Sequence, residues 1–198
     1  MSTVRPSTLA AAPCVPGNIF LVGLMGAGKT SVGRLLAKRF GKTFYDCDLE
    51  IERRTGVKIP VIFEIEGEEG FRAREAAVLR ELAALDDIVL ATGGGAILRE
   101  DNRQALTQNG TVVYLRASVP TLRQRIARRA REVEARITDE YLAELNTLYE
   151  EWIGGFGLAP VLVVPSDSLD FVRESRDLDA IVTTVQEMRV YPIDRFAV

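Results

Sequence analysis

The sequence contains no histidine among its 198 residues. This absence excludes the Ser-His-Asp and Cys-His arrangements of nucleophilic enzymes, and with them every metal site built on imidazole. Acid–base chemistry in this protein therefore falls to aspartate, glutamate, lysine, tyrosine or cysteine side chains.

Cysteine is scarce as well, and long hydrophobic runs are missing. The two cysteines, Cys14 and Cys47, are too few for a disulfide framework and lack the CxxC spacing of zinc sites. No apolar run approaches the roughly 18 to 20 residues that span a bilayer. Residues 1–17 also lack the pattern of a signal peptide. We therefore expect a reducing, cytoplasmic compartment and no membrane partner.

The chain has no excess of positive charge. Its 28 acidic and 25 basic residues give a formal net charge of -3. This balance argues against a uniformly basic face, so we expect no nucleic-acid partner.

The hydrophobic pattern predicts one α/β domain. Residues 1–17 are rich in Ser, Thr, Ala and Pro and are expected to form a disordered leader. Residues 18–189 are expected to form the domain, and residues 190–198 an uncommitted tail. Short apolar runs with helical stretches between them predict a five-stranded parallel sheet with helices on both faces. The expected strands are residues 19–22, 43–45, 88–91, 111–115 and 161–164.

Residues 23–30 read GLMGAGKT and match the phosphate-loop pattern G-x-x-x-x-G-K-[ST] between a predicted strand and a predicted helix. In such loops, backbone N–H groups surround phosphate oxygens at a positive helix terminus. Lys29 supplies a charge to the outer phosphates, and Thr30 can ligate Mg²⁺. The nucleotide-binding residues expected here are Gly26, Ala27, Gly28, Lys29, Thr30 and Ser31.

The phosphate loop predicts a nucleoside triphosphate but leaves the acceptor open. No later strand ends in the acidic pair of motor ATPases, and no Asn-Lys-x-Asp guanine signature occurs, which favours a small-molecule kinase. Asp46 and Asp48 follow the second predicted strand, where ligands gather in open α/β sheets. One carboxylate could support the metal while the other accepts a hydroxyl proton. Alternatively, Asp48 could cap the next helix.

Two further clusters lie before residue 100. Arg72 and Glu75 have the spacing of an intrahelical ion pair, which by itself favours a solvated charged face. Gly93, Gly94 and Gly95 follow a predicted strand directly. Three glycines cost folding entropy unless a backbone or ligand approaches closely, so we interpret them as the floor of a second pocket.

Residues 18–129 resemble the shikimate kinases through four stretches. These are GLMGAGKT, FYDCDLEIERRTG, IFEIEGEEGFRARE and ATGGGA. The resemblance implies a P-loop kinase fold in which Lys29 and Thr30 serve phosphate and magnesium and Asp46 supports the metal. It implies that Asp48, Arg72 and the backbone of Gly93, Gly94 and Gly95 bind shikimate. Asp48 would then be the base at the attacked hydroxyl, and Arg72 the carboxylate clamp.

The C-terminal third, about residues 120–190, departs from that pattern. The Arg-Pro-Leu-Leu lid is absent, and Leu145 stands where the family has a second substrate arginine. This part instead resembles the deoxynucleoside kinases, whose Arg-x-Arg lid corresponds here to Arg129 and Arg131, followed by Glu132 and Glu134. We expect a lid over about residues 129–138, with Arg129 on the nucleotide, Arg131 catalytic and Arg136 a weaker candidate. For Arg123 and Arg125, a partly solvated helix face is an equal alternative.

The sequence therefore favours an ATP- and Mg²⁺-dependent kinase that phosphorylates the 3-hydroxyl of shikimate. Two alternatives stay open: a deoxynucleoside kinase, and a nucleotide-binding module with impaired catalysis. The Asp-Arg-Ser acceptor motif of deoxynucleoside kinases does not occur before residue 120. We expect a monomer by default.

Overall fold

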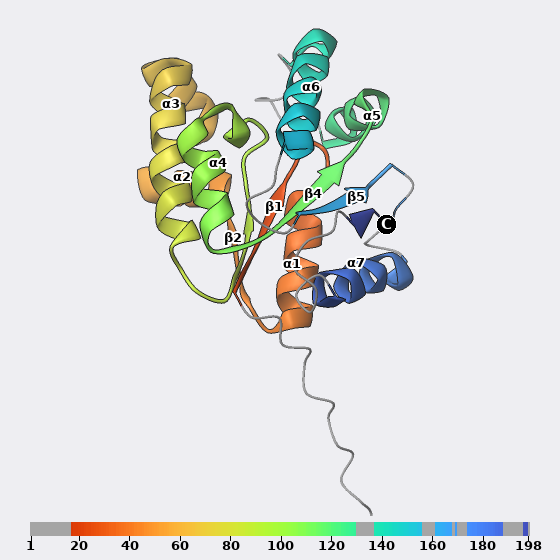
Figure 1. Cartoon of the computed structure of the whole chain (residues 1–198). Helices are drawn as coiled ribbons and strands as arrows, with labels where there is room; N and C mark the ends of the chain where they lie inside the picture. The colour runs from red at the N-terminus through yellow and green to blue at the C-terminus, as the bar shows by residue number, and fades with distance from the viewer. Residues whose placement is uncertain are drawn as a thin grey trace, which may run out of the picture.

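The structure, a computed structural model, describes residues 17–129, 137–155, 161–167, 169, 174–187 and 196–197. All five predicted strands are present and lie in one parallel sheet (Figure 1). They are β1 (Asn18–Val22), β2 (Thr43–Asp46), β3 (Ile88–Ala91), β4 (Gly110–Arg116) and β5 (Val161–Pro165). The predicted fold class is confirmed.

A sixth short strand, β6 (Phe196–Ala197), pairs in parallel with β5 and completes the order β2-β3-β1-β4-β5-β6. The expectation of an uncommitted tail was therefore wrong at these two residues. Without β6, the outer edge of β5 would expose unpaired backbone N–H and C=O groups. Residues 196–197 pair with this edge through main-chain hydrogen bonds. Two residues are too short to show the alternation by which a strand is recognised.

Seven α-helices and one 3₁₀ turn are described. They are α1 (Lys29–Phe40), α2 (Cys47–Thr55), α3 (Ile59–Ala83), η1 (Ala96–Leu98), α4 (Glu100–Gln108), α5 (Val119–Arg129), α6 (Asp139–Gly155) and α7 (Ser175–Glu187).

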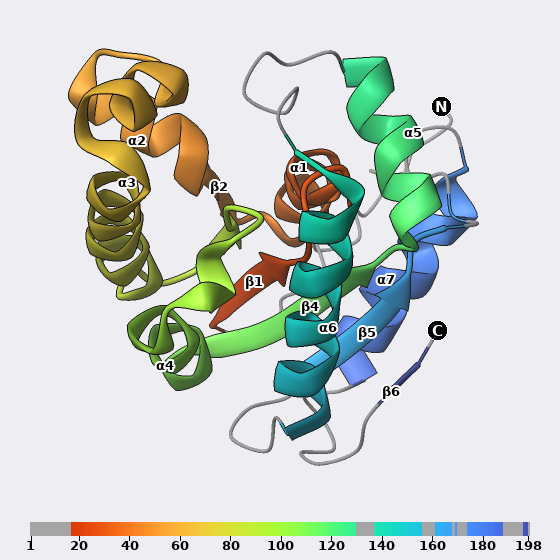
Figure 2. The ribbon, with the colours of Figure 1, turned by 90° about the horizontal axis from the view of Figure 1, so that it is seen from above.

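Helices cover both faces of the sheet, as predicted. On one face, Gly33 of α1 fits against the side chain of Leu21 in β1, and α7 packs beside α1. On the other face, Tyr149 of α6 stacks on Tyr114 of β4. Leu21 pairs with Val113, and the side chain of the next residue, Tyr114, points the opposite way because strand side chains alternate. In Figure 2, α6 lies over β1 and β4, and α2 and α3 lie beside β2.

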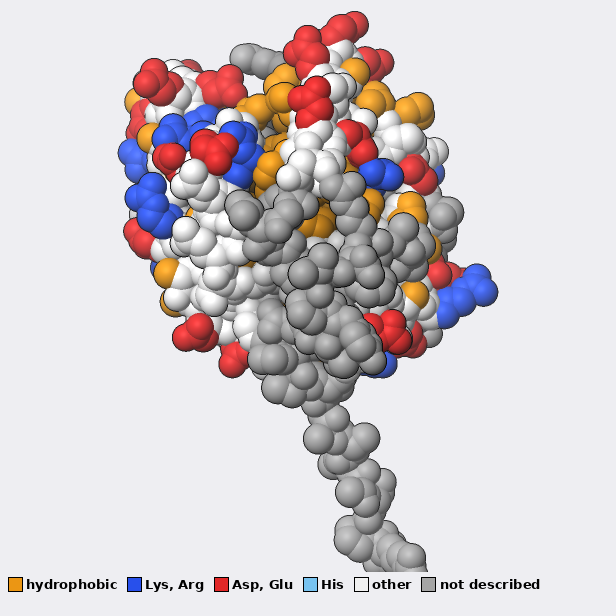
Figure 3. All heavy atoms as spheres, viewed as in Figure 1, with side chains coloured by type: hydrophobic (Ala, Val, Ile, Leu, Met, Phe, Trp, Pro, Cys, Tyr) orange, Lys and Arg blue, Asp and Glu red, His pale blue; other side chains and the backbone are white. Residues whose placement is uncertain are grey.

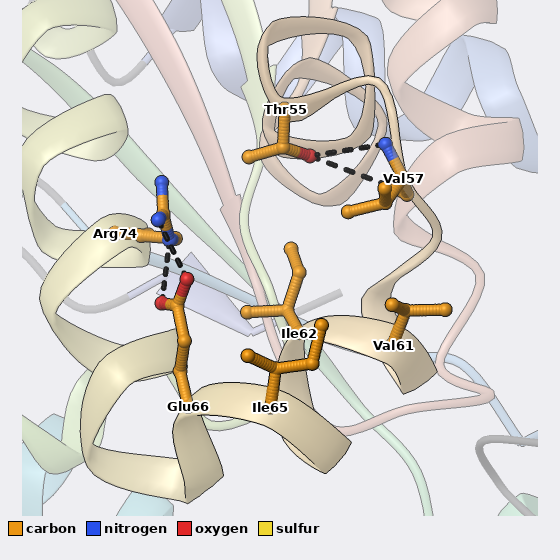
Figure 4. Close-up of a pocket in the computed structure, with 7 residues that line it drawn as sticks. All are labelled: Thr55, Val57, Val61, Ile62, Ile65, Glu66 and Arg74. Atoms are coloured by element: carbon orange, nitrogen blue, oxygen red, sulfur yellow. Dashed lines mark hydrogen bonds and ion pairs between the residues drawn. The ribbon is translucent and has the colours of Figure 1, made fainter.

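Helix α3 bends at Gly67, whose backbone has φ 69° and ψ -173°. This is a conformation that essentially only glycine adopts. The bend lets Arg74 of the second half reach back to Glu66 of the first, with two hydrogen bonds of 2.7 Å. Figure 4 shows this ion pair beside a small hollow lined by Val61, Ile62 and Ile65. The first half of α3 and the end of α2, called the outer wall below, line this hollow together with Arg74.

On the face shown in Figure 3, acidic and basic side chains are intermixed around an apolar strip. Within the described residues, no helix has both the length and the apolar character required to cross a membrane.

Candidate active site

The phosphate loop (residues 23–30) leaves the carboxyl end of β1 and opens α1. Its backbone turns tightly at Gly23, where φ is 140°. A side chain there would lie 2.6 Å from the carbonyl oxygen of Leu115. Gly28 has φ 101° and occupies the N-cap position of α1 without a capping side chain. The N-terminus of α1 therefore lacks the side-chain cap that would compete with an anion, as the motif predicts.

Lys29 is buried beneath this loop. Its Nζ donates to the carbonyl oxygens of Gly23 and Leu24, at 2.6 and 2.9 Å. These are backbone acceptors of the phosphate loop itself, so the ammonium group is held beside the position that the motif assigns to phosphate. Ser31, the next residue but one along α1, is exposed.

Thr30, in the first turn of α1, meets Asp46, the last residue of β2. The Thr30 hydroxyl donates to Asp46 Oδ2 at 2.7 Å. The other oxygen of Asp46, Oδ1, accepts from the backbone N–H of Leu49 and caps α2. The helix cap is thus Asp46 rather than Asp48, which lies in the first turn of α2. The strand thus extends one residue beyond the expected limit, and α2 begins directly after Asp46.

Arg72 and Glu75 form the predicted ion pair, with 2.8 Å between Nη1 and Oε2. The expectation of a solvated charged face was wrong for this pair, because the Glu75 side chain is 0% exposed and that of Arg72 is 14% exposed. Glu68 adds a second, weaker contact to Arg72 at 3.3 Å. Burial raises the pKa of the Glu75 carboxyl, and the neighbouring Arg72 and Lys29 charges partly oppose that rise. Glu75 Oε1 is buried without a hydrogen-bond partner.

The triple-glycine loop (residues 93–95) follows β3 and supports these side chains. An added Cβ at Gly93 would collide with Glu75 Oε1 and approach Asp48 Oδ1 to 3.1 Å. One at Gly95 would lie 2.7 Å from Arg72 Nη1. The loop therefore brings Asp48, Arg72 and Glu75 together over a backbone floor. This is the close approach that the three glycines predict.

The two loops touch each other. An added Cβ at Gly94 would lie 2.9 Å from the backbone nitrogen of Met25 in the phosphate loop. The expected phosphate site and the expected second pocket are therefore adjacent, at the carboxyl ends of β1 and β3. This is the edge at which ligands bind in open α/β sheets.

Two tyrosines of α6 complete this region, and the sequence reasoning missed both. Tyr149 is fully buried, and its hydroxyl lies 3.2 Å from Gly23 O and 3.0 Å from Gly94 O. Burial raises the pKa of Tyr141, and the nearby Arg72 charge opposes that rise. In the sequence, Leu142, Leu145 and Tyr149 form a helical stripe, and such a stripe indicates only core packing. The one signal that could have identified Tyr149 is that its buried hydroxyl requires a hydrogen-bond partner.

The arginines near the expected lid divide into two groups. Arg123 bonds to Asp139 and to the carbonyl oxygen of Ile137, and Arg125 bonds to the carbonyl oxygen of Ser166 at 2.5 Å. These two arginines tie α5 to neighbouring segments. Arg129 is exposed and ends α5. The remaining lid candidates, Arg131 and Arg136, and the acidic residues Glu132 and Glu134 lie outside the described residues.

Leu145, at the position of the second substrate arginine in the resemblance, is 1% exposed and belongs to the hydrophobic core. Its side chain fits this apolar setting and supplies no charge to the site.

Residues 25–152 match the family model described as shikimate kinase. The chain belongs to the shikimate kinase family. A shikimate kinase of Chromobacterium violaceum is 59% identical over 135 residues, which cover 68% of this chain and 73% of the relative. Another, from Thiobacillus denitrificans, is 61% identical over 134 residues, with the same two coverages.

Among solved structures, shikimate kinase from Acinetobacter baumannii in complex with shikimate has a TM-score of 0.72 and 40% sequence identity. The match covers 90% of this chain and 96% of that one. Deoxyadenosine kinase from M. mycoides with bound dATP has a TM-score of 0.58 at 20% identity, over 85% and 98% of the two chains. At that identity, the likeness shows a shared fold alone.

The family match extends further along the chain than the resemblance in the sequence predicted. It continues to residue 152, well past residue 129, where the shikimate kinase resemblance was expected to end. The resemblance of the C-terminal third to deoxynucleoside kinases stays a prediction.

Proposed function

We propose that this protein transfers the γ-phosphoryl group of ATP to the 3-hydroxyl of shikimate, as an enzyme of aromatic amino acid biosynthesis. The observation that carries the proposal is the contact between the two loops. Arg72 lies against Gly95, and Gly94 lies against Met25 of the phosphate loop. An anionic acceptor held by Arg72 would therefore have its hydroxyl close to the phosphates, the positioning on which phosphoryl transfer depends.

In this proposal, Asp48 is the general base. It accepts the proton of the attacking hydroxyl while the oxygen forms a bond to the γ-phosphorus and ADP departs. Asp48 Oδ1 faces Gly93 on the acceptor side of the site, consistent with that role. Lys29 neutralises charge on the outer phosphates, and the N–H groups of Gly26, Gly28, Thr30 and Ser31 bind phosphate oxygens, while the N–H of Ala27 donates to Leu24 O at 3.1 Å and holds the loop closed around them.

Thr30 and Asp46 are the proposed magnesium-binding residues. Their oxygens lie 2.7 Å apart at the mouth of the phosphate loop and offer the hard donors that Mg²⁺ prefers. The described residues include no cluster of three or more acidic, cysteine or histidine groups that could hold a metal. A site with few protein ligands fits Mg²⁺, which keeps several waters and binds substrate phosphates. When bound, the ion neutralises charge on the β- and γ-phosphates.

Arg72 would bind the shikimate carboxylate through its planar guanidinium, with Glu75 fixing its orientation. Because Leu145 replaces the second arginine, we expect the carboxylate to be held more weakly than by two. One lost charge partner in a desolvated site costs about 2 to 5 kcal/mol. The roles of Arg129 at the nucleotide and Arg131 at the transferring phosphoryl group stay predictions, as do the cytoplasmic location and the monomeric state.

The test is a coupled ADP-release assay with Mg-ATP, run in parallel with shikimate and the four deoxynucleosides, and with Lys29→Ala as the blank. We expect release that depends on shikimate. Release that depends only on a deoxynucleoside would instead assign the chain to the nucleoside kinases. ATP binding without transfer to any acceptor would indicate a binding module.

The substitution Asp48→Asn distinguishes the role of Asp48 as general base from its role in binding the acceptor. The amide keeps the shape of the carboxylate but does not accept the hydroxyl proton. We expect turnover to be lost while nucleotide affinity is retained. Wild-type turnover in this variant would contradict the assignment.

A further inference from the structure

The side chain of Tyr149 lies between the two loops of the site. It projects from α6 and is fully buried. Its hydroxyl oxygen is 3.2 Å from the carbonyl oxygen of Gly23 in the phosphate loop and 3.0 Å from that of Gly94 in the triple-glycine loop. One loop serves the nucleotide and the other the acceptor in the proposed function, on which this inference rests.

A tyrosine hydroxyl has one hydrogen, so it makes a full-strength hydrogen bond to only one of these carbonyls at a time. Burial raises the pKa of Tyr149 far above its usual range, which keeps that hydrogen in place. The two oxygen–oxygen distances differ by only 0.2 Å, so both carbonyls are within reach of the same hydrogen. A buried carbonyl that loses its donor is destabilised. Gly23 is buried and Gly94 is partly buried, so the choice between their carbonyls has an energetic consequence for both loops, and the larger one for the phosphate loop.

Lys29 governs that choice. Its ammonium group donates to the Gly23 carbonyl at 2.6 Å, so this oxygen already has a strong donor. The Tyr149 hydroxyl then stabilises the site most when it donates to the carbonyl oxygen of Gly94. A nucleotide phosphate would attract the Lys29 ammonium and so weaken its bond to Gly23. The Tyr149 hydrogen would then move to Gly23, and Gly94 would lose its donor.

We propose that Tyr149 is a positioning residue that couples nucleotide binding to the triple-glycine loop, and through that loop to acceptor affinity. The coupling runs through one hydrogen shared by Gly23 and Gly94. By thermodynamic linkage, nucleotide and acceptor must then change each other's affinity by the same factor.

The test compares Tyr149→Phe with Tyr114→Phe. Both variants keep an aromatic ring in the same stacked pair, whose centroids are 5.3 Å apart. The Tyr114 hydroxyl bonds to Glu150 at 3.1 Å rather than to either loop, so Tyr114→Phe is a matched control. Thermal unfolding of both variants shows that the fold is retained.

Calorimetric titration gives the dissociation constant of shikimate with and without Mg-ADP. In the wild type and in Tyr114→Phe, we expect these two dissociation constants to differ by a ratio on the order of fivefold, which is the contribution of one net hydrogen bond. In Tyr149→Phe the ratio should approach one. A wild-type ratio of one, or an unchanged ratio in Tyr149→Phe, would overturn the proposal.

Hydrogen exchange separates this inference from the identity of the acceptor, because it needs no acceptor. Mg-ADP alone should change amide exchange over residues 94–96 in the wild type and in Tyr114→Phe, but not in Tyr149→Phe. An equal response in Tyr149→Phe would refute the coupling. Failure of the wild type to bind shikimate, with the exchange difference intact, would refute the proposed acceptor alone.

Discussion

Replacement of Gly95 by alanine should damage acceptor binding without damaging the fold. The backbone of Gly95 has φ -100°, which any residue adopts, so the substitution introduces no backbone strain. The new methyl group would lie 2.7 Å from Arg72 Nη1 and 2.8 Å from Cζ, and closer still to Nη2. All three atoms belong to the end of one flexible side chain, which can retreat at little cost in stability.

The size of the effect follows from how far the guanidinium must move. Ordinary contact begins at about 3.5 Å, so Arg72 must retreat by about 1 Å. That movement shifts the guanidinium relative to its 2.8 Å contact with Glu75. A displacement of about 1 Å in a positioning group reduces catalysis on the order of 100-fold, or about 2.7 kcal/mol. We expect the loss in kcat/KM for shikimate, with the affinity for nucleotide unchanged.

Steady-state kinetics with varied shikimate, with nucleotide titration and thermal unfolding alongside, would measure this. Gly154→Ala is the matched control, because a methyl group there meets nothing within 4 Å. Gly93→Ala is the contrasting variant: its methyl group would strike the fully buried Glu75 carboxylate, so that variant should lose stability. Wild-type kcat/KM in Gly95→Ala would refute the placement of Arg72 as the acceptor clamp.

Three further predictions concern other parts of the site. Thr30→Ala should raise the Mg²⁺ concentration needed for half-maximal rate by on the order of tenfold, because the hydroxyl beside Asp46 is lost; an unchanged Mg²⁺ titration would contradict the metal assignment. Arg131→Ala should lower kcat by on the order of 1,000-fold if this arginine stabilises the transferring phosphoryl group, and wild-type turnover would reject that role. Burial raises the pKa of Glu75 above 4.5, so the folded state holds this proton more tightly than the unfolded chain does. The free energy of unfolding should therefore fall as pH rises from 4.5 through the folded-state pKa, and Glu75→Gln should remove this component, measured as the difference between the two pH profiles.

Much of the fold could be predicted because its strands are buried on both faces. Residues 19–22 and 88–91 read as uninterrupted apolar runs, and both form strands within one residue of the expected limits. The glycine pattern of residues 23–30 has few backbone solutions, so the phosphate loop was also predictable. The two-residue β6 carries no such pattern, since main-chain pairing with β5 decides its conformation.

The candidate site was predictable only in part. Each of three site residues belongs to a pattern that can be recognised in the sequence. Asp46 ends a strand, Arg72 lies on a helix, and Gly93 begins a run of three glycines. By contrast, the burial of Glu75 depends on how α3 packs over the triple-glycine loop, which spacing within α3 does not contain. Tyr149 contacts Gly23 across 126 positions of the chain. Contacts of that kind follow from the tertiary fold, and local patterns do not predict them.

The bend at Gly67 has a consequence for how α3 can be redesigned. It divides α3 into an outer wall before the bend and a segment after it that carries Arg72 and Glu75. The two halves meet at Gly67, at the ion pair of Glu66 with Arg74 and at the stacked rings of Phe63 and Phe71, so an exchange of the outer wall that keeps these contacts should leave Arg72 in place along its helix. Recombination or design at this seam would change the outer wall while preserving Arg72, the proposed carboxylate clamp.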